Sequence, residues 1–231
     1  MTDSKPSIDF STVLASSVHD MKNSVGMLLA SLENLIQETP PKNEEEAKRF
    51  TVLQYEASRI NGELIQLLTL YRMDDSVLPV RVDQHYIIDV LEDQVARNHL
   101  LVETSEISMS LQCDEDLNWY YDIDLIGSVV HNVVLNCVRY TKSKIEISAE
   151  VEGEYLCITV ADDGPGYPAS MLQKPSGLLE DAADVNDGGT HLGLYFAEKI
   201  ANLHTQHNLR GFIKLENGGS LGGGVFKLYI P

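Results

Sequence analysis

Two groups of polar residues in this chain have types and spacings suited to phosphoryl transfer. The first is His19-Asp20, set inside a heptad pattern of apolar residues. An imidazole is a nucleophile, and a neighbouring carboxylate can fix its tautomer and raise the nucleophilicity of the other ring nitrogen. The second is Asn132-x-x-x-Asn136, followed by the run Asp162-Asp163-Gly164-Pro165-Gly166. Together they predict a phosphorylatable histidine and a nucleotide pocket, the two halves of one reaction.

The apolar pattern around His19 predicts a helix that exposes this side chain. Apolar residues recur at alternating spacings of four and three, which is typical of a long helix with one coiled-coil-like seam: Phe10, Leu14, Val18, Met21, Val25, Leu28, Leu32 and Leu35. His19 lies about 100° around the helix from Val18, so it should face solvent, with Asn23 one turn further on the same side. The alternative is that His19, Asp20 and Asn23 are ordinary polar residues on a solvated helix face.

The second group begins on a helix expected between residues 124 and 140. Its apolar stripe should face a core: Ile126, Val130, Val133 and Cys137. Asn132, Asn136, Arg139 and Tyr140 share a different, polar stripe. A magnesium and phosphate site would use such residues, whereas capping and local hydrogen bonding by buried amides is the alternative reading.

Two glycine-containing segments complete the expected pocket. Asp162 follows an alternating strand and could accept a hydrogen bond from an adenine amino group, while Gly164 and Gly166 would let the chain turn closely past it. A simple turn is the alternative reading of these three residues. Further on, a helix opens whose N-terminal amides and dipole suit phosphate oxygens, at Gly188, Gly189, Thr190, Leu192 and Gly193.

The remaining pattern predicts two domains in an α+β chain. Residues 1–76 should form an antiparallel helical hairpin, broken at Pro40-Pro41, and residues 77–231 an α/β sandwich with helices on one sheet face. Two helices cannot bury their apolar seams fully against each other, so we expect a homodimer that pairs two hairpins in a four-helix bundle. The expected helices and strands of the second domain are 84–99, 107–111, 119–121, 124–140, 145–151, 156–160, 190–204, 212–215 and 225–230.

Composition narrows the class of partner. The 231 residues carry 35 acidic and 17 basic side chains, a formal charge of −18, which disfavours binding to nucleic acid and to anionic membranes. The three cysteines show no metal-binding or disulfide spacing, which indicates a reducing compartment. Neither a signal peptide nor a run of about 18 apolar residues is present, so we expect a cytoplasmic protein without membrane insertion.

Four segments resemble the sequence boxes of two-component sensor histidine kinases. Val18–Asn23 is similar to the phosphoacceptor box, Val129–Thr141 to the Asn box, and Asp162–Gly166 and Gly188–Leu194 to the two Gly boxes. The resemblance implies an ATP-dependent protein histidine kinase that passes the γ-phosphoryl group to its histidine and then to an aspartate of a response-regulator receiver domain.

Roles for individual residues follow from the same resemblance. It implies that His19 is the phosphoacceptor, that Asp20 is the base, and that Asn23 aids dephosphorylation of the response regulator, which adds phosphatase activity. It also implies that Asn136 binds Mg²⁺ and that Arg139 contacts phosphate. Asp162 would contact adenine.

The chain departs from the family pattern at several positions, and these keep a second reading open. Ser24 stands where many members have proline, and His191 stands where glycine is usual. Negative charge is also concentrated near the expected triphosphate, at Glu180, Asp181, Asp184 and Asp187. The alternative is therefore a histidine phosphotransferase or response-regulator phosphatase whose second domain does not use ATP. A gyrase-type ATPase clamp is a third reading, but it has no use for His19.

Overall fold

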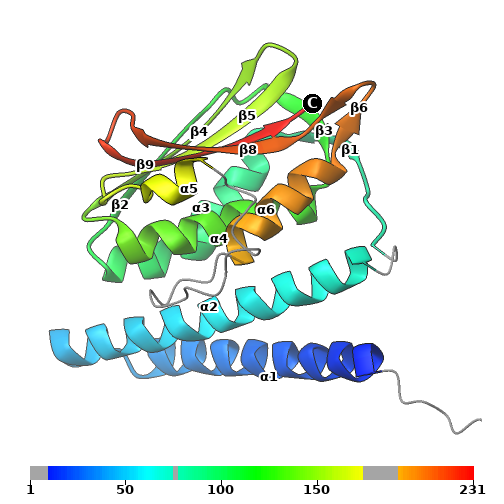
Figure 1. Ribbon diagram of the computed structural model, residues 1–231. Coiled ribbons are helices and arrows are strands. Elements are labelled where there is room, and N and C mark those ends of the chain that lie inside the picture. Colours follow the sequence, from blue (N-terminus) through cyan, green and yellow to red (C-terminus); the bar gives the residue numbers. More distant parts are fainter. Residues whose placement is uncertain (1–9, 75–77, 174–191) are drawn as a thin grey trace, which may run out of the picture.

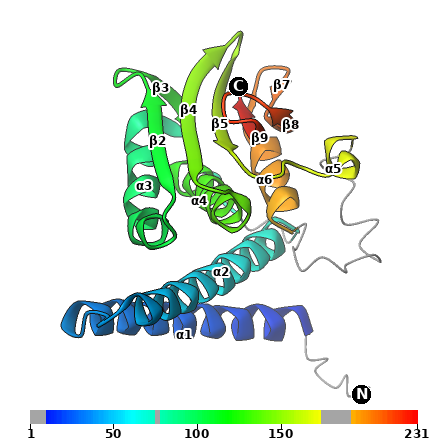
Figure 2. The ribbon, with the colours of Figure 1, turned by 90° about the vertical axis from the view of Figure 1, so that its left-hand side faces the viewer.

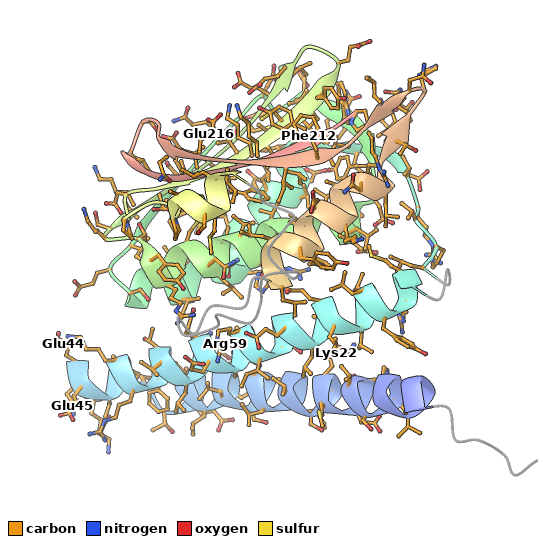
Figure 3. The ribbon with its side chains drawn as sticks, viewed as in Figure 1. Lys22, Glu44, Glu45, Arg59, Phe212 and Glu216 are labelled. Carbon is orange, nitrogen blue, oxygen red and sulfur yellow. The ribbon has the colours of Figure 1, made fainter. Side chains whose placement is uncertain are left out.

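The computed structural model describes residues 10–74, 78–173 and 192–231. The chain begins with two long helices, α1 (Phe10–Glu38) and α2 (Glu44–Asp74), which run antiparallel as a hairpin (Figure 1). The antiparallel hairpin with its break at Pro40-Pro41 is as expected from the sequence. The Asn43 side chain caps α2 by accepting a hydrogen bond from the backbone N–H of Glu46 at 2.8 Å. Acidic residues occupy the first turn of α2, where they favour the positive end of the helix dipole: Glu44, Glu45 and Glu46. Figure 3 shows the first two projecting from the end of the helix.

A five-stranded sheet forms one layer of the second part of the chain. Its order is β2-β4-β5-β9-β8, and its strands pair antiparallel except for the parallel pair β2 and β4. The strands are β2 (Ser108–Cys113), β4 (Lys144–Glu152), β5 (Tyr155–Asp162), β8 (Phe212–Gly218) and β9 (Gly223–Ile230). The expected hairpin between the two alternating strands is confirmed, because β4 and β5 pair in register around Gly153.

In the part of the chain that the structure describes, the helices that pack on this sheet lie on one face, as expected for an α/β sandwich. The covering helices are α3 (Ile87–Thr104), α4 (Ile123–Tyr140) and α6 (Leu192–Leu203). Figures 1 and 2 show them between the sheet and the hairpin, so that α2 packs on the helix layer and α1 lies beyond α2. The opposite sheet face carries Phe212 and Glu216 of β8 (Figure 3). The core between sheet and helices therefore sets the position of α4.

Several short elements differ from the expected pattern. Residues 84–86 belong to strand β1 (Asp83–Tyr86), which pairs with β3 (Asn118–Tyr121), so the helix expected from residue 84 begins only at Ile87. The strands β1 and β3 form a small sheet of their own, apart from the five-stranded sheet. No local pattern in the sequence indicates this pairing. The short elements α5 (Ala169–Gln173), β6 (Thr205–Gln206) and β7 (Leu209–Arg210) were also not predicted.

The apolar seam of the hairpin is only partly covered within one chain. Val18 is 4% exposed, whereas Met21, Leu28 and Leu53 are 56%, 57% and 56% exposed. A heptad pattern of apolar residues is typical of side chains that are buried between helices, and these three are not buried within one chain. A single hairpin therefore leaves a wide apolar face open.

Asp163 ties the end of α4 to the start of β4. Its carboxylate accepts hydrogen bonds from the hydroxyls of Thr141 and Ser143 and from the backbone N–H groups of Lys142, Ser143 and Lys144. These bonds, above all the one from Thr141, hold the pKa of the carboxyl well below its usual range. Sequence reasoning gave Asp163 no role, since its partners lie about 20 residues away along the chain.

We expect Asp163→Ala to destabilise the fold by about 1 to 2 kcal/mol at pH 7, because three backbone donors and two hydroxyls lose a charged acceptor close to solvent. The folded-state pKa lies below the unfolded value of about 3.9, so this stability is present above pH 4 and is lost as pH falls towards the folded pKa. Urea unfolding at pH 7 and at pH 3 measures both effects. A gap between variant and wild type that stays constant or widens at pH 3 would contradict this account.

Candidate functional site

His19 lies on the solvent-facing side of α1 with both of its predicted companions beside it. Its side chain is 52% exposed. Ring nitrogen Nδ1 lies 3.5 Å from Oδ1 of Asp20 and 3.4 Å from Nδ2 of Asn23. Both contacts are long, and both are made to Nδ1. Neither Asp20 nor Asn23 therefore contacts Nε2. This arrangement suits an exposed imidazole that is oriented through Nδ1 and reacts through Nε2.

The helix continues without a break past this cluster. Ser24 stands where many of the resembled kinases have proline, and its hydroxyl donates to the backbone carbonyl of Asp20 at 2.9 Å. A serine that bonds back to the preceding turn keeps the helical hydrogen-bond ladder, which proline would interrupt. His19 is therefore presented by a regular stretch of α1.

On α4, the two asparagines face different surroundings. Asn132 is inserted between α2 and α6: Gln66 Nε2 donates to its Oδ1 at 2.6 Å, and a Cβ atom on Gly193 would come within 2.5 Å of its Nδ2. Asn136, one turn later, is exposed, as are Arg139 and Tyr140. The guanidinium of Arg139 lies 5.2 Å from the centre of the Tyr140 ring.

The apolar stripe of α4 faces the core as expected, and it carries Cys137 to the end of β5. Cys137 is 4% exposed, and its thiol points at Oδ2 of Asp162 at 3.9 Å. Burial and the nearby carboxylate raise the pKa of the thiol, so it stays protonated. Cys137 thus links the helix of Asn136 to the strand end that carries Asp162.

Asp162 is a buried carboxylate at the end of β5. It is 7% exposed, and its Oδ1 accepts hydrogen bonds from the N–H groups of Gly164 at 2.7 Å and Gly224 at 3.3 Å. A Cβ on Gly164 would come within 2.5 Å of the Tyr140 carbonyl oxygen, so only glycine fits there. The two backbone donors bind Oδ1, and Oδ2 faces the weak thiol donor of Cys137.

Tyr167 and Asn217 build the wall beside Asp162, and sequence reasoning assigned neither. The Tyr167 ring would contact a Cβ on Gly224, and burial, with Cys137 and Asp162 nearby, raises its pKa. Asn217 exchanges two hydrogen bonds with the Tyr167 backbone, at 2.7 and 2.8 Å. Gly166 takes a φ of 79° directly against Asn217. An aromatic residue directly after the glycines was the available signal for Tyr167.

Part of the predicted phosphate segment lies outside the described residues. Gly188, Gly189 and Thr190 are among these, as are His191 and the four acidic residues between 180 and 187. Leu192 and Gly193 begin α6, and Gly193 is buried against Asn132. The described part of the expected nucleotide site therefore comprises the start of α6, the second half of α4 and the end of β5.

The residues present fit a nucleotide that brings its own cation. Among the described residues there is no cluster of three or more His, Cys, Asp or Glu side chains that could hold a metal ion. Mg²⁺ commonly binds through one or two protein oxygens together with substrate phosphates and water. The exposed amide of Asn136 can supply one such oxygen, and Asp162 offers a carboxylate oxygen to a purine amino group.

Comparison with known proteins gives a family match over the C-terminal part of the chain. Residues 121–231 match the family described as histidine kinase-, DNA gyrase B- and HSP90-like ATPases. The sensor histidine kinase CssS of Bacillus subtilis (strain 168) is 26% identical over 221 residues, which cover 95% of this chain and 46% of CssS. The sensor histidine kinase CpxA of Escherichia coli (strain K12) is 27% identical over 194 residues, covering 80% of this chain and 40% of CpxA. The chain thus spans less than half the length of these two relatives.

Solved structures agree on the fold. The Acinetobacter baumannii histidine kinase AdeS covers 92% of this chain and 96% of its own, with a TM-score of 0.58 and 21% identity. Full-length ShkA in complex with AMPPNP covers 96% of this chain and 46% of its own, with a TM-score of 0.62 and 18% identity. No described helix has both the length and the apolar character of a membrane span. Residues 121–231 thus match the histidine kinase-, DNA gyrase B- and HSP90-like ATPase family, and 80 to 95% of the chain is similar to sensor histidine kinases.

Proposed function

We propose that this chain is the autokinase core of a two-component phosphorelay, transferring the ATP γ-phosphoryl group to His19 and from there to a receiver-domain aspartate. The observation that carries the proposal is the pairing of an exposed imidazole contacted by Asp20 and Asn23 with a second domain that presents Asn136 and Asp162. Neither cluster alone would specify this reaction. The homology of residues 121–231 supports the ATP-binding half.

The site residues divide by role. Asp162 would recognise the adenine amino group, and Asn136 would hold Mg²⁺, with Arg139 near the phosphates. Mg²⁺ neutralises phosphate charge when it is bound. Asp20 would orient the imidazole and accept its proton, and Asn23 would position water against a phosphorylated receiver. The remaining proposed nucleotide contacts are Asn132, Tyr140, Gly164, Gly166, Gly188, Gly189, Thr190, Leu192 and Gly193.

Transfer to His19 requires the two domains to move. We place the hairpin domain at residues 1–76 and the ATP-binding domain at 77–231. In the described arrangement α2 lies between most of α1, the helix that carries His19, and the helix layer that includes α4 (Figures 1 and 2). In-line attack needs the nitrogen and the phosphorus at roughly 3 to 3.5 Å. The ATP-binding domain would therefore have to reorient around the hairpin.

We further infer a cytoplasmic homodimer. The exposed apolar face of the hairpin, with Met21, Leu28 and Leu53 more than half exposed, supports pairing with a second copy in a four-helix bundle. The three cysteines are free thiols, which suits a reducing compartment. A receiver domain is the partner that the phosphohistidine would serve.

The test is incubation of the purified chain with Mg²⁺ and γ-labelled ATP. We expect label that is lost in acid and retained in base, as a phosphoramidate is, and that moves to an aspartate when receiver domains are added. Label that survives acid would indicate a phosphoester and contradict the proposal. Calorimetric titration with Mg·ADP addresses the alternative of a phosphotransferase that does not use ATP: failure to bind would support that alternative and reject the kinase.

A further inference from the structure

We infer that Gln66 couples hairpin docking to the nucleotide site, so that the docked hairpin and a bound nucleotide compete for Asn132. This inference rests on the proposed nucleotide site. Gln66 lies on α2 and is 4% exposed, and its Nε2 donates to Asn132 Oδ1 at 2.6 Å. It is a side-chain hydrogen bond between the hairpin and α4, and it ends on a residue of the proposed pocket.

Asn132 is well placed to transmit such a coupling. It stands one turn before Asn136 on α4, and its amide is packed against Gly193 at the start of α6. A side chain held on one side by Gln66 and on the other by the α6 backbone cannot turn its oxygen towards a ligand without breaking the bond to α2. The docked hairpin therefore fixes Asn132 in one orientation.

The contact between hairpin and domain is incompletely satisfied, which makes it easy to open. Among the described residues, four buried side-chain polar atoms have no protein hydrogen-bond partner: Asn61 Oδ1, Gln66 Oε1, Gln94 Oε1 and Asn132 Nδ2. All four residues line one cavity of about 430 Å³ between α2, α3 and α4. Unpaired polar groups at a buried contact weaken it, because each must be rehydrated or remain unsatisfied. The polar part of the docked contact is thus specific but weak, and it stands beside the apolar packing of Leu70 and Met73 of α2 against the core.

Coupling of this kind is reciprocal. If docking disfavours the nucleotide, then the nucleotide disfavours docking by the same factor. Nucleotide binding would release α2 from α4 and free the ATP-binding domain to approach His19. The chain would then hold the two domains together at rest and separate them when substrate arrives.

The experiment compares Mg·ADP binding to the full chain and to Gln66→Met, which keeps the side-chain length but cannot donate. We expect the variant to bind about three- to tenfold more tightly, the value of one hydrogen bond. The matched control is Gln54→Met, since Gln54 is a buried glutamine of the same helix, 9% exposed, that does not line the cavity. We expect its affinity to stay within about twofold of wild type.

A distance measurement separates coupling from a general loosening of the fold. Spin labels on Val52→Cys of α2 and Glu150→Cys of β4, both exposed sites, report hairpin docking in a Cys113→Ser background. Mg·ADP should lengthen the distance in wild type, and Gln66→Met should show the longer distance without nucleotide. Equal affinities, or a distance that nucleotide does not change, would overturn the coupling alone. Absence of nucleotide binding in both proteins would overturn the proposed function as well.

Discussion

His19→Gln is expected to reduce phosphoryl incorporation from γ-labelled ATP to background. An amide is not a nucleophile at neutral pH, so replacing the imidazole removes the acceptor and not merely its orientation. Glutamine preserves the polarity and approximate length of the side chain. Because the His19 side chain is 52% exposed, the change in unfolding free energy should stay within about 0.5 kcal/mol. Autoradiography of the purified variant, with circular dichroism as the folding check, measures both.

The control for this experiment is another exposed histidine on a helix. His99 on α3 is 71% exposed and lies 3.7 Å from Glu103, one turn away, so it also has a carboxylate neighbour. His99→Gln should retain full incorporation, because the surroundings of His99 contain no part of the proposed site. Nucleotide affinity should be unchanged in both variants. Residual label in His19→Gln at the wild-type level would place the phosphoryl group on another residue and reject His19 as the acceptor.

Local patterns predicted the elements that present the site. The alternation of fours and threes predicted α1 and the outward position of His19, and the stripe through Cys137 predicted which face of α4 is buried. Both predictions succeed because a helix repeats every 3.6 residues, so side-chain direction follows from spacing alone. The strict alternation along β4 and β5 worked for the corresponding reason in strands.

Local sequence patterns could not predict contacts between residues that are distant along the chain. The Gln66–Asn132 bond joins residues on two domains, and Asp163 collects donors from a loop about 20 residues away. The strand pair β1 and β3 likewise forms only because Trp119 and His85 are brought together by the fold. Each depends on tertiary packing, which overrides local preference. These long-range contacts include the one proposed to regulate the site.

The Asn box shows what local spacing predicts and what depends on long-range packing. Spacing correctly placed Asn132 and Asn136 on one side of α4, four residues apart. It could not distinguish them, yet one is packed between α2 and α6 while the other is exposed. The difference arises from where the hairpin lies against the helix layer. Two residues of one motif can therefore differ in burial and hydrogen bonding. Of the two asparagines, only Asn136 is accessible to a ligand while the hairpin is docked.

Asp162→Asn is expected to weaken Mg·ADP binding by roughly a hundredfold, the scale of an unmatched buried hydrogen bond. The amide retains Oδ1, which can still accept from Gly164 and Gly224, so the loop should keep its conformation. The other atom changes from an acceptor to an NH₂ donor, which would oppose the adenine amino group donor to donor. Calorimetry measures the loss, and thermal unfolding verifies the fold.

The neighbouring carboxylate supplies a matched control, and guanine supplies a test of the mechanism. Asp163 is bound by Thr141 and the following loop, so Asp163→Asn should change stability while leaving nucleotide affinity within about twofold. In Asp162→Asn the new NH₂ can donate to the O6 carbonyl of guanine, so the preference for ADP over GDP should narrow even as overall affinity falls. If both purines lose affinity by the same factor, Asp162 shapes the loop and does not read the base.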